Sequence, residues 1–147
     1  MTTEQAVEKA KELVGSSQTF IMATVDADNK PQIRWMGALA PDPADEKVRY
    51  LVCGTQSRKM EQIAANPATQ LMFSNSDYSC IVTLSGSCEP VQDAQTKQAV
   101  WEAVPGLTQY FQSVDDPNYA VLRFTICCLE VLCMGEAHEP VRVDLCD

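Results

Sequence analysis

A series of apolar, β-prone runs follows the chain, and most of these runs are joined by short polar turns. This pattern restricts the fold more than any other feature, because strands joined by short turns pair antiparallel, whereas parallel neighbours need long crossovers. Six runs are present, at residues 18–25, 31–40, 48–53, 69–74, 79–91 and 119–134. Six antiparallel strands in a chain this short usually curl up to remove their edges. We therefore expect a mainly β fold of the α+β class, a small barrel with helices packed outside it.

Helical segments alternate with these strands. Thr2 followed by Gln5 is a capping-box pattern, and small and apolar residues then recur at helical spacing. Gly86 interrupts an apolar run and is a candidate β-bulge. Helices are expected at residues 1–17, 58–66 and 93–104, and residues 136–147 form a tail whose structure no pattern indicates.

The composition indicates the class of molecule. A chain of 147 residues, 46% of them hydrophobic, can bury one core, so residues 1–147 are expected to form a single domain. The formal net charge of -9 makes the surface as a whole repel nucleic acid and anionic membranes. No apolar run approaches the roughly 20 residues of a membrane-spanning helix, and the first segment is polar and amphipathic. We expect a soluble cytoplasmic protein.

The seven cysteines form an odd set with no Cys-x-x-Cys spacing, and His138 is the only histidine. A zinc site is therefore not expected. Most of the cysteines lie inside apolar, strand-like runs, where a free thiol packs as a small hydrophobic side chain. We expect buried packing thiols in a reducing compartment, with a redox sensor as the alternative, because a reactive thiol needs exposure and a lowered pKa.

The triplet Ser57-Arg58-Lys59 stands at the expected start of the second helix. A helix N-terminus has unpaired N–H groups and a partial positive charge, so it attracts phosphate or carboxylate. Two cations there are unfavourable, by a few tenths to ~1 kcal/mol each, unless an anion lies between them. We expect Arg34 nearby, because its strand should lie beside the strand that leads into this helix. These side chains predict an anion site, and the alternative is a Ser57 cap with two solvated cations.

Longer stretches resemble a known family. The runs FIMATVDADNKPQIRWM, YLVCGTQSRKMEQIAANPATQLMF, IVTLSGSCEPV and VWEAV…YF…DDPNYAVLRFT look like the general stress protein branch of the pyridoxamine 5′-phosphate oxidase-like FMN-binding split barrels. The resemblance covers about residues 18–126, and its most specific piece is the SRK triplet that opens a helix after an apolar strand. It implies a six-stranded antiparallel split β-barrel with flanking helices. It also implies a homodimer that binds FMN in a groove between the subunits.

The resemblance further implies which residues hold FMN. By position, Arg34, Ser57, Arg58 and Lys59 would contact the phosphate, which is then the expected anion. The residues expected along the flavin are Trp35, Met36, Gly37, Val52 and Cys53, with Cys80 or Ile81 reaching it from the other subunit and Trp101 as a further candidate. Barrel packing is the alternative role for Trp35, and a core or dimer contact is the alternative for Trp101.

The expected function is that of an FMN-dependent oxidoreductase whose small substrate the sequence does not identify. The chain lacks the Trp and Arg-x-His-type ending with which pyridoxamine phosphate oxidases grip their substrate, so we do not expect that activity. No side chain is assigned as a catalytic acid or base. Two alternatives remain, a flavin-binding or flavin-sensing module without turnover and a split barrel that binds a deazaflavin or haem.

Overall fold

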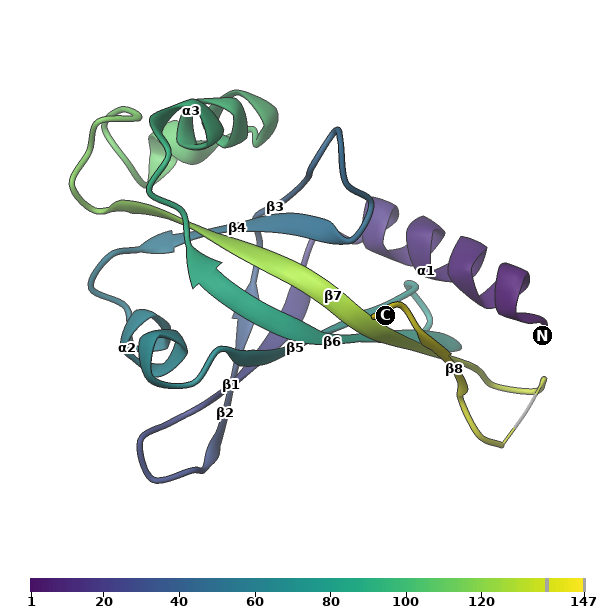
Figure 1. Ribbon diagram of the computed structural model, residues 1–147. Coiled ribbons are helices and arrows are strands. Elements are labelled where there is room, and N and C mark those ends of the chain that lie inside the picture. The colour runs from purple at the N-terminus through teal and green to yellow at the C-terminus, as the bar shows by residue number, and fades with distance from the viewer. Residues whose placement is uncertain (137, 147) are drawn as a thin grey trace.

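One antiparallel sheet of eight strands, flanked by three α-helices, makes up the described part of the chain (Figure 1). The computed structural model describes residues 1–136 and 138–146. The strands are β1 (Phe20–Val25), β2 (Pro31–Met36), β3 (Leu39–Pro41), β4 (Val48–Gly54), β5 (Ala68–Ser74), β6 (Cys80–Pro90), β7 (Tyr119–Cys133) and β8 (Val141–Asp144). The helices are α1 (Thr3–Ser16), α2 (Arg58–Ala65) and α3 (Ala94–Ala103), with a 3-10 turn, η1, at Leu107–Gln109. The expected α+β class is confirmed.

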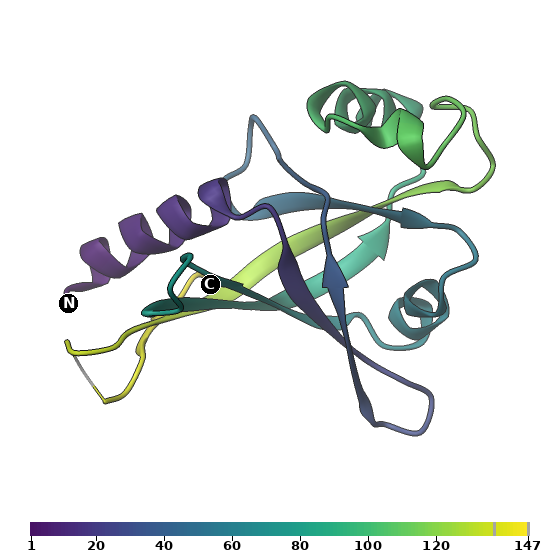
Figure 2. The ribbon, with the colours of Figure 1, turned by 180° about the vertical axis from the view of Figure 1, so that it is seen from behind.

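The sheet curves into a half-barrel whose two ends are β2 and β3. The strands follow the order β2-β1-β5-β6-β7-β4-β3, and β8 pairs with β7. Between β2 and β3 the chain has just Gly37 and Ala38, and within the described residues no ladder pairs these two strands. We call this opening the seam. Figure 2 shows α1 and α3 well apart, over different parts of the sheet.

Two strands were not expected. The apolar run at residues 31–40 predicts one strand, but the chain turns at the seam, so that β2 pairs with β1 while β3 pairs with β4. The tail at residues 136–147 contains β8, whose Val143 is buried against the core. The sheet therefore has eight strands instead of six. Ala137 and Asp147 of this tail lie outside the described residues.

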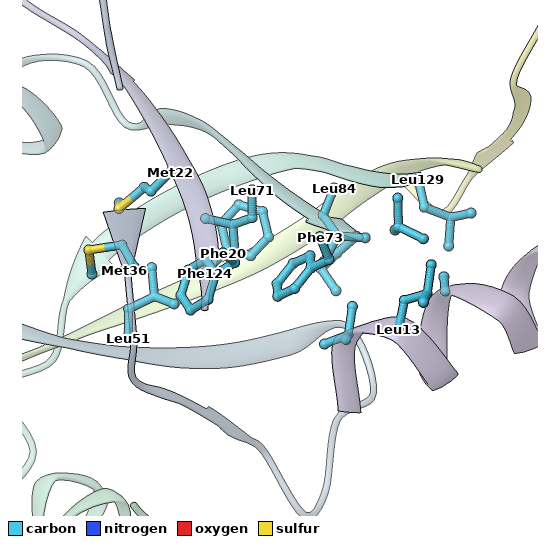
Figure 3. Close-up of a cluster of buried hydrophobic side chains, with 14 of the residues drawn as sticks. Leu13, Phe20, Met22, Met36, Leu51, Leu71, Phe73, Leu84, Phe124 and Leu129 are labelled. Atoms are coloured by element: carbon cyan, nitrogen blue, oxygen red, sulfur yellow. The ribbon is translucent and has the colours of Figure 1, made fainter. Parts of the chain in front are cut away.

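The core fills the inside of the half-barrel, and α1 packs against it (Figure 3). The predicted capping box is confirmed, because Gln5 N–H donates to Thr2 Oγ1 at 3.1 Å and Thr2 N–H donates to Gln5 Oε1 at 2.8 Å. The rings of Phe20 and Phe73 stack with their centres 5.0 Å apart. Leu13 brings the apolar face of α1 into the same cluster. A second, smaller cluster joins α3 and the turn η1 to β3, β4 and β7.

The predicted bulge in β6 is confirmed by a register shift between Ser85 and Gly86. At this point β7 comes so close that a Cβ atom on Gly86 would lie 1.9 Å from the backbone oxygen of Thr125. Glycine is therefore required here by the close approach of two backbones.

Four of the cysteines form two disulfides, Cys80–Cys133 and Cys127–Cys146. For these four the prediction of free packing thiols is wrong, whereas Cys53, Cys88 and Cys128 are free and buried as predicted. Cys80 and Cys133 are directly opposed on β6 and β7, and the chain after β8 returns along Cys127. Such pairings depend on strand register, which the cysteine spacing does not reveal.

Peptide mapping under non-reducing conditions should find these two cross-links and three free thiols. Reduction should lower the free energy of unfolding, because the cross-links span sequence separations of 53 and 19 residues. Loop entropy gives upper estimates of about 4 and 3 kcal/mol for loops of this length. Denaturant unfolding before and after reduction and alkylation measures the effect. An unchanged unfolding midpoint would contradict the pairing.

Candidate functional site

The start of α2 lacks the side-chain cap that the other two helices have. Thr2 caps α1 and Asp93 caps α3, but the Ser57 hydroxyl donates instead to the carbonyl oxygen of Gly54, at 2.8 Å. Ser57 thus occupies the predicted N-cap position without capping the helix. The Met60 N–H group donates to the Ser57 carbonyl oxygen at 3.1 Å, so the N–H groups of Arg58 and Lys59 are the ones left available to a ligand at this helix start.

Three cations gather at this helix start, namely Arg34, Arg58 and Lys59. Among residues 1–136 and 138–146 the ion pairs involve other cations, and none includes these three. Partial burial holds the pKa of Lys59 below its ordinary value, and the nearby charge of Arg34 lowers it further. The pKa of Arg34 is likewise lowered, by burial and then by Arg58. A chain with a net charge of -9 thus concentrates positive charge without a carboxylate partner at one place.

Arg34 reaches the cluster by a different route from the one expected. Its segment, β2, pairs with β1 and not with β4, and Arg34 lies opposite Met22. The helix α2 packs against β1, the strand next to β2. The helix therefore lies close to Arg34 on β2. The guanidinium group donates to the Met22 carbonyl oxygen at 3.3 Å and to Gln62 Oε1 at 3.0 Å. The predicted neighbourhood is correct, but the strand pairing used to predict it is wrong.

A pocket of about 340 Å³ opens at the seam. Its wall consists of Trp35, Met36, Gly37, Ala38, Val52, Cys53, Gly54, Val104, Pro105, Leu107, Tyr110 and Phe111. None of these side chains is charged, so the pocket suits an apolar group. Five of the residues predicted along a flavin are among them.

Cys53 connects this pocket to the cation cluster. The thiol lines the pocket and is buried, and burial raises its pKa while Lys59 and Ser57 oppose the rise. Its sulfur lies 3.6 Å from the sulfur of Met60 on α2. Cys53 thus lies between the two features, because it lines the apolar pocket and contacts Met60 on the helix that begins at the cation cluster.

Trp35 lines the seam pocket, whereas Cys80, Ile81 and Trp101 do not. Trp35 is 67% exposed, so it does not serve barrel packing, and it also lines a groove of about 830 Å³ together with Ile81. Cys80 adjoins Ile81, but its sulfur is bonded to Cys133. Trp101 packs edge-on against the ring of Tyr119, with the ring centres 5.3 Å apart, and does not line the seam pocket. The structure thus does not bring Cys80, Ile81 or Trp101 to the cation cluster of the same chain.

Sequence reasoning missed two sets of residues. The segment after α3, from Val104 to Phe111, forms one wall of the pocket, although its Tyr110-Phe111 pair was part of the resemblance. Gln32 and Gln62 accept hydrogen bonds from the two arginines, and single glutamines carry no sequence signal. In the part of the chain that the structure describes, no three metal-ligating side chains gather, and no helix has the length and apolar character needed to cross a bilayer.

The family model described as pyridoxamine 5′-phosphate oxidase matches residues 6–133. No curated protein sequence matches significantly. A protein related to general stress protein 26 from Clostridium acetobutylicum has a similar structure, with a TM-score of 0.83 at 24% identity over 98% of this chain and 97% of that one. General stress protein 26 from Bacillus anthracis gives 0.76 at 20% identity, over 94% and 97% of the two chains.

A heme binding protein from Mycobacterium smegmatis gives a TM-score of 0.75 at 16% identity, over 98% of this chain and 60% of that one. At these identities the solved structures show a common fold alone. The family model, in contrast, covers most of the sequence, and it confirms the predicted family. The chain belongs to the pyridoxamine 5′-phosphate oxidase family.

Proposed function

We propose that the protein is an FMN-binding flavoprotein of the general stress protein type, which acts as an oxidoreductase on a small substrate. One observation carries this proposal. Three cations gather at an uncapped helix start, and none of them forms an ion pair with a carboxylate within the described residues. This cluster lies next to the uncharged pocket at the seam. A phosphate-bearing planar ring system matches both parts.

The residues present fit FMN. Arg34, Arg58 and Lys59, together with the first N–H groups of α2, would hold the phosphate, because guanidinium and ammonium groups form charge-assisted bonds to its oxygens. The backbone from Trp35 to Gly37 and at Val52–Cys53 would run along the ring. FMN, when bound, supplies the redox chemistry, and the protein binds and orients it. No side chain is assigned as an acid or base.

The outer face of the sheet supports a homodimer with the flavin site at the interface. Ile33 and Trp35 on β2 are 72% and 67% exposed, and Met72 on β5 is 39% exposed. The register places Trp35 and Met72 opposite the same residue of β1, Ile21, so they share one face. Exposed apolar surface of this kind usually marks an interface. A second copy of the chain would cover this face and bring Ile81 toward the flavin.

An absorbance spectrum and ligand titrations test the proposal. The purified protein should show flavin bands or take up FMN tightly, in preference to riboflavin, FAD, a deazaflavin and haem. Oxidation of nicotinamide cofactors by the loaded protein would distinguish an enzyme from a module without turnover. A protein that binds none of these ligands, or prefers haem, would overturn the proposal. For the dimer, sedimentation that shows the flavin-loaded protein as a single 16.2 kDa species would contradict the shared site.

We also propose that the protein is cytoplasmic. Cytoplasmic thiols are normally kept reduced, whereas the structure contains two disulfides. Trapping the thiols with an alkylating reagent in intact cells measures their state directly. A cytoplasmic location predicts that Cys80 and Cys133 are free thiols in the cell and form a disulfide only after purification.

The preference for FMN over riboflavin should fall at alkaline pH. The pKa of Lys59 is below the ordinary lysine value, and a bound phosphate would raise it. The charged ammonium group is therefore the form that binds FMN. The affinity for FMN declines as the pH rises above the pKa of Lys59 in the unliganded protein, because the ammonium group then loses its proton. Below about pH 6 the phosphate itself loses its second charge, so the preference should weaken there too. Fluorescence titrations of both flavins across pH measure it. Lys59→Arg should remove the alkaline decline, and a decline that persists in this variant would contradict the assignment.

A further inference from the structure

Each arginine of the cation cluster is held by the side-chain amide of a glutamine. Arg34 Nη2 donates to Gln62 Oε1 at 3.0 Å, and Arg58 Nη2 donates to Gln32 Oε1 at 3.4 Å. Arginine offers only donors, so each amide has to present its oxygen. A carboxylate would accept these bonds more strongly, yet both positions carry the neutral group.

Gln62 is fixed from behind by a buried hydroxyl. Thr24 on β1 is 1% exposed and donates its hydroxyl hydrogen to the same Oε1 atom of Gln62. Apart from tyrosines and cysteines, Thr24 and Thr69 are the two buried polar residues in the described part of the chain. The chain thus uses a core position to orient an amide on α2, and through it the guanidinium group of Arg34.

Gln32 stands between Arg58 and Asp26. Its Nε2 donates to Asp26 Oδ2 at 2.8 Å while its Oε1 accepts from Arg58. The other oxygen of Asp26 accepts the backbone N–H groups of Asp28 and Lys30, both at 2.9 Å. The carboxylate is therefore occupied by the turn between β1 and β2. It forms no ion pair with Arg58 within the described residues.

We infer that Gln32 and Gln62 are positioning residues that fix Arg58 and Arg34 without neutralising them, and that this arrangement selects a dianionic phosphate ligand over its uncharged analogue. The inference rests on the proposed function, since FMN and riboflavin are such a pair. Each glutamine orients a guanidinium group, and because the amide is neutral, the positive charge can still pair with the phosphate. Glutamate at the same place would compete with the phosphate as an internal anion.

The test compares Gln62→Glu with Gln62→Met, and Gln32→Glu with Gln32→Met. Dissociation constants for FMN and riboflavin are measured by fluorescence titration at several salt concentrations. Each Glu variant should raise the FMN constant by about 10-fold or more, since it pairs one of the arginines. Each Met variant should raise the FMN dissociation constant by about 3-fold. Methionine no longer orients the guanidinium group, but it leaves the positive charge of the arginine unpaired. Riboflavin binding should change by less than about 2-fold in all four.

A merely structural role predicts a different pattern. FMN and riboflavin would then weaken together, and Met would do at least as much harm as Glu. Gln95→Glu, at an exposed position in the first turn of α3, adds the same charge far from the cluster and should change neither constant. The salt dependence of FMN binding should become shallower in both Glu variants, because fewer uncompensated charges meet the phosphate.

Failure of this inference can be told apart from failure of the proposed function. A wild-type protein that binds FMN no better than riboflavin would overturn the proposed phosphate site itself. A wild type that prefers FMN, with unchanged preference in both Glu variants, would overturn the positioning role alone. Thermal unfolding of every variant shows whether it is folded, and the two glutamines provide two independent tests.

Discussion

Replacing Arg58 and Lys59 together by alanine should raise the dissociation constant for FMN by about 100-fold or more. Each residue is expected to form a charge-assisted contact with the phosphate, typically worth about 1.5 to 3 kcal/mol, and every 1.4 kcal/mol is about tenfold in affinity. Riboflavin has the same ring and no phosphate, so its affinity should change by less than about 3-fold. Fluorescence quenching on titration of the flavin-free protein measures both constants.

The matched control removes two positive charges elsewhere. Lys9→Ala with Lys11→Ala changes the net charge by the same amount, and both lysines already pair with glutamates on or near α1. This control should leave FMN affinity nearly unchanged. Equal losses for FMN and riboflavin in the Arg58/Lys59 variant would show that the change damages the fold or the ring pocket instead of the phosphate contact.

Gly86→Ala should destabilise the protein by about 3 kcal/mol or more. The added methyl group would lie 1.9 Å from the backbone oxygen of Thr125 and 2.9 Å from its carbonyl carbon, and backbone atoms cannot rotate away. The two strands would have to separate along the ladder of β6 and β7, which spans the length of β6. Urea unfolding followed by circular dichroism gives the difference in free energy of unfolding.

Gly15→Ala is the control for the same chemical change. Nothing lies within 4 Å of a Cβ at Gly15, which is near the end of α1. Alanine is the better helix former by about 0.5 to 1 kcal/mol, so this variant should be slightly more stable than the wild type. A loss below about 1 kcal/mol for Gly86→Ala would mean that the bulge can relax, contrary to the expected steric conflict.

Local signals predict most of the elements correctly. Three short-range features lie where the pattern indicates. They are the polar turns between the expected strands, at residues 26–30 and 75–78, the Thr2–Gln5 capping box, and the end of the second helix near residue 66. The break between β2 and β3 is different. WMGALA is apolar throughout, and the chain changes partner strand there because of the curvature of the whole sheet, which a local pattern does not contain.

The sequence pointed to the charged residues of the candidate site and to five of the residues that line the seam pocket. Arg58 and Lys59 are conspicuous at a helix start in an acidic chain. The glutamines that orient the arginines were not predictable, because their role arises from contacts between residues 28 and 26 positions apart in sequence. The same holds for the disulfides, whose partners are chosen by register and not by spacing.

The seam also bears on how such a chain can change during evolution. The pocket lies where two neighbouring strands are joined by Gly37 and Ala38 instead of by a ladder of hydrogen bonds. Its width can therefore change through side-chain substitutions without loss of main-chain pairing in the sheet. A fold with this property can exchange one bound molecule for another while its strand pairing stays intact. The seam is thus the place in the sheet where the ligand can change at the least cost to main-chain hydrogen bonding.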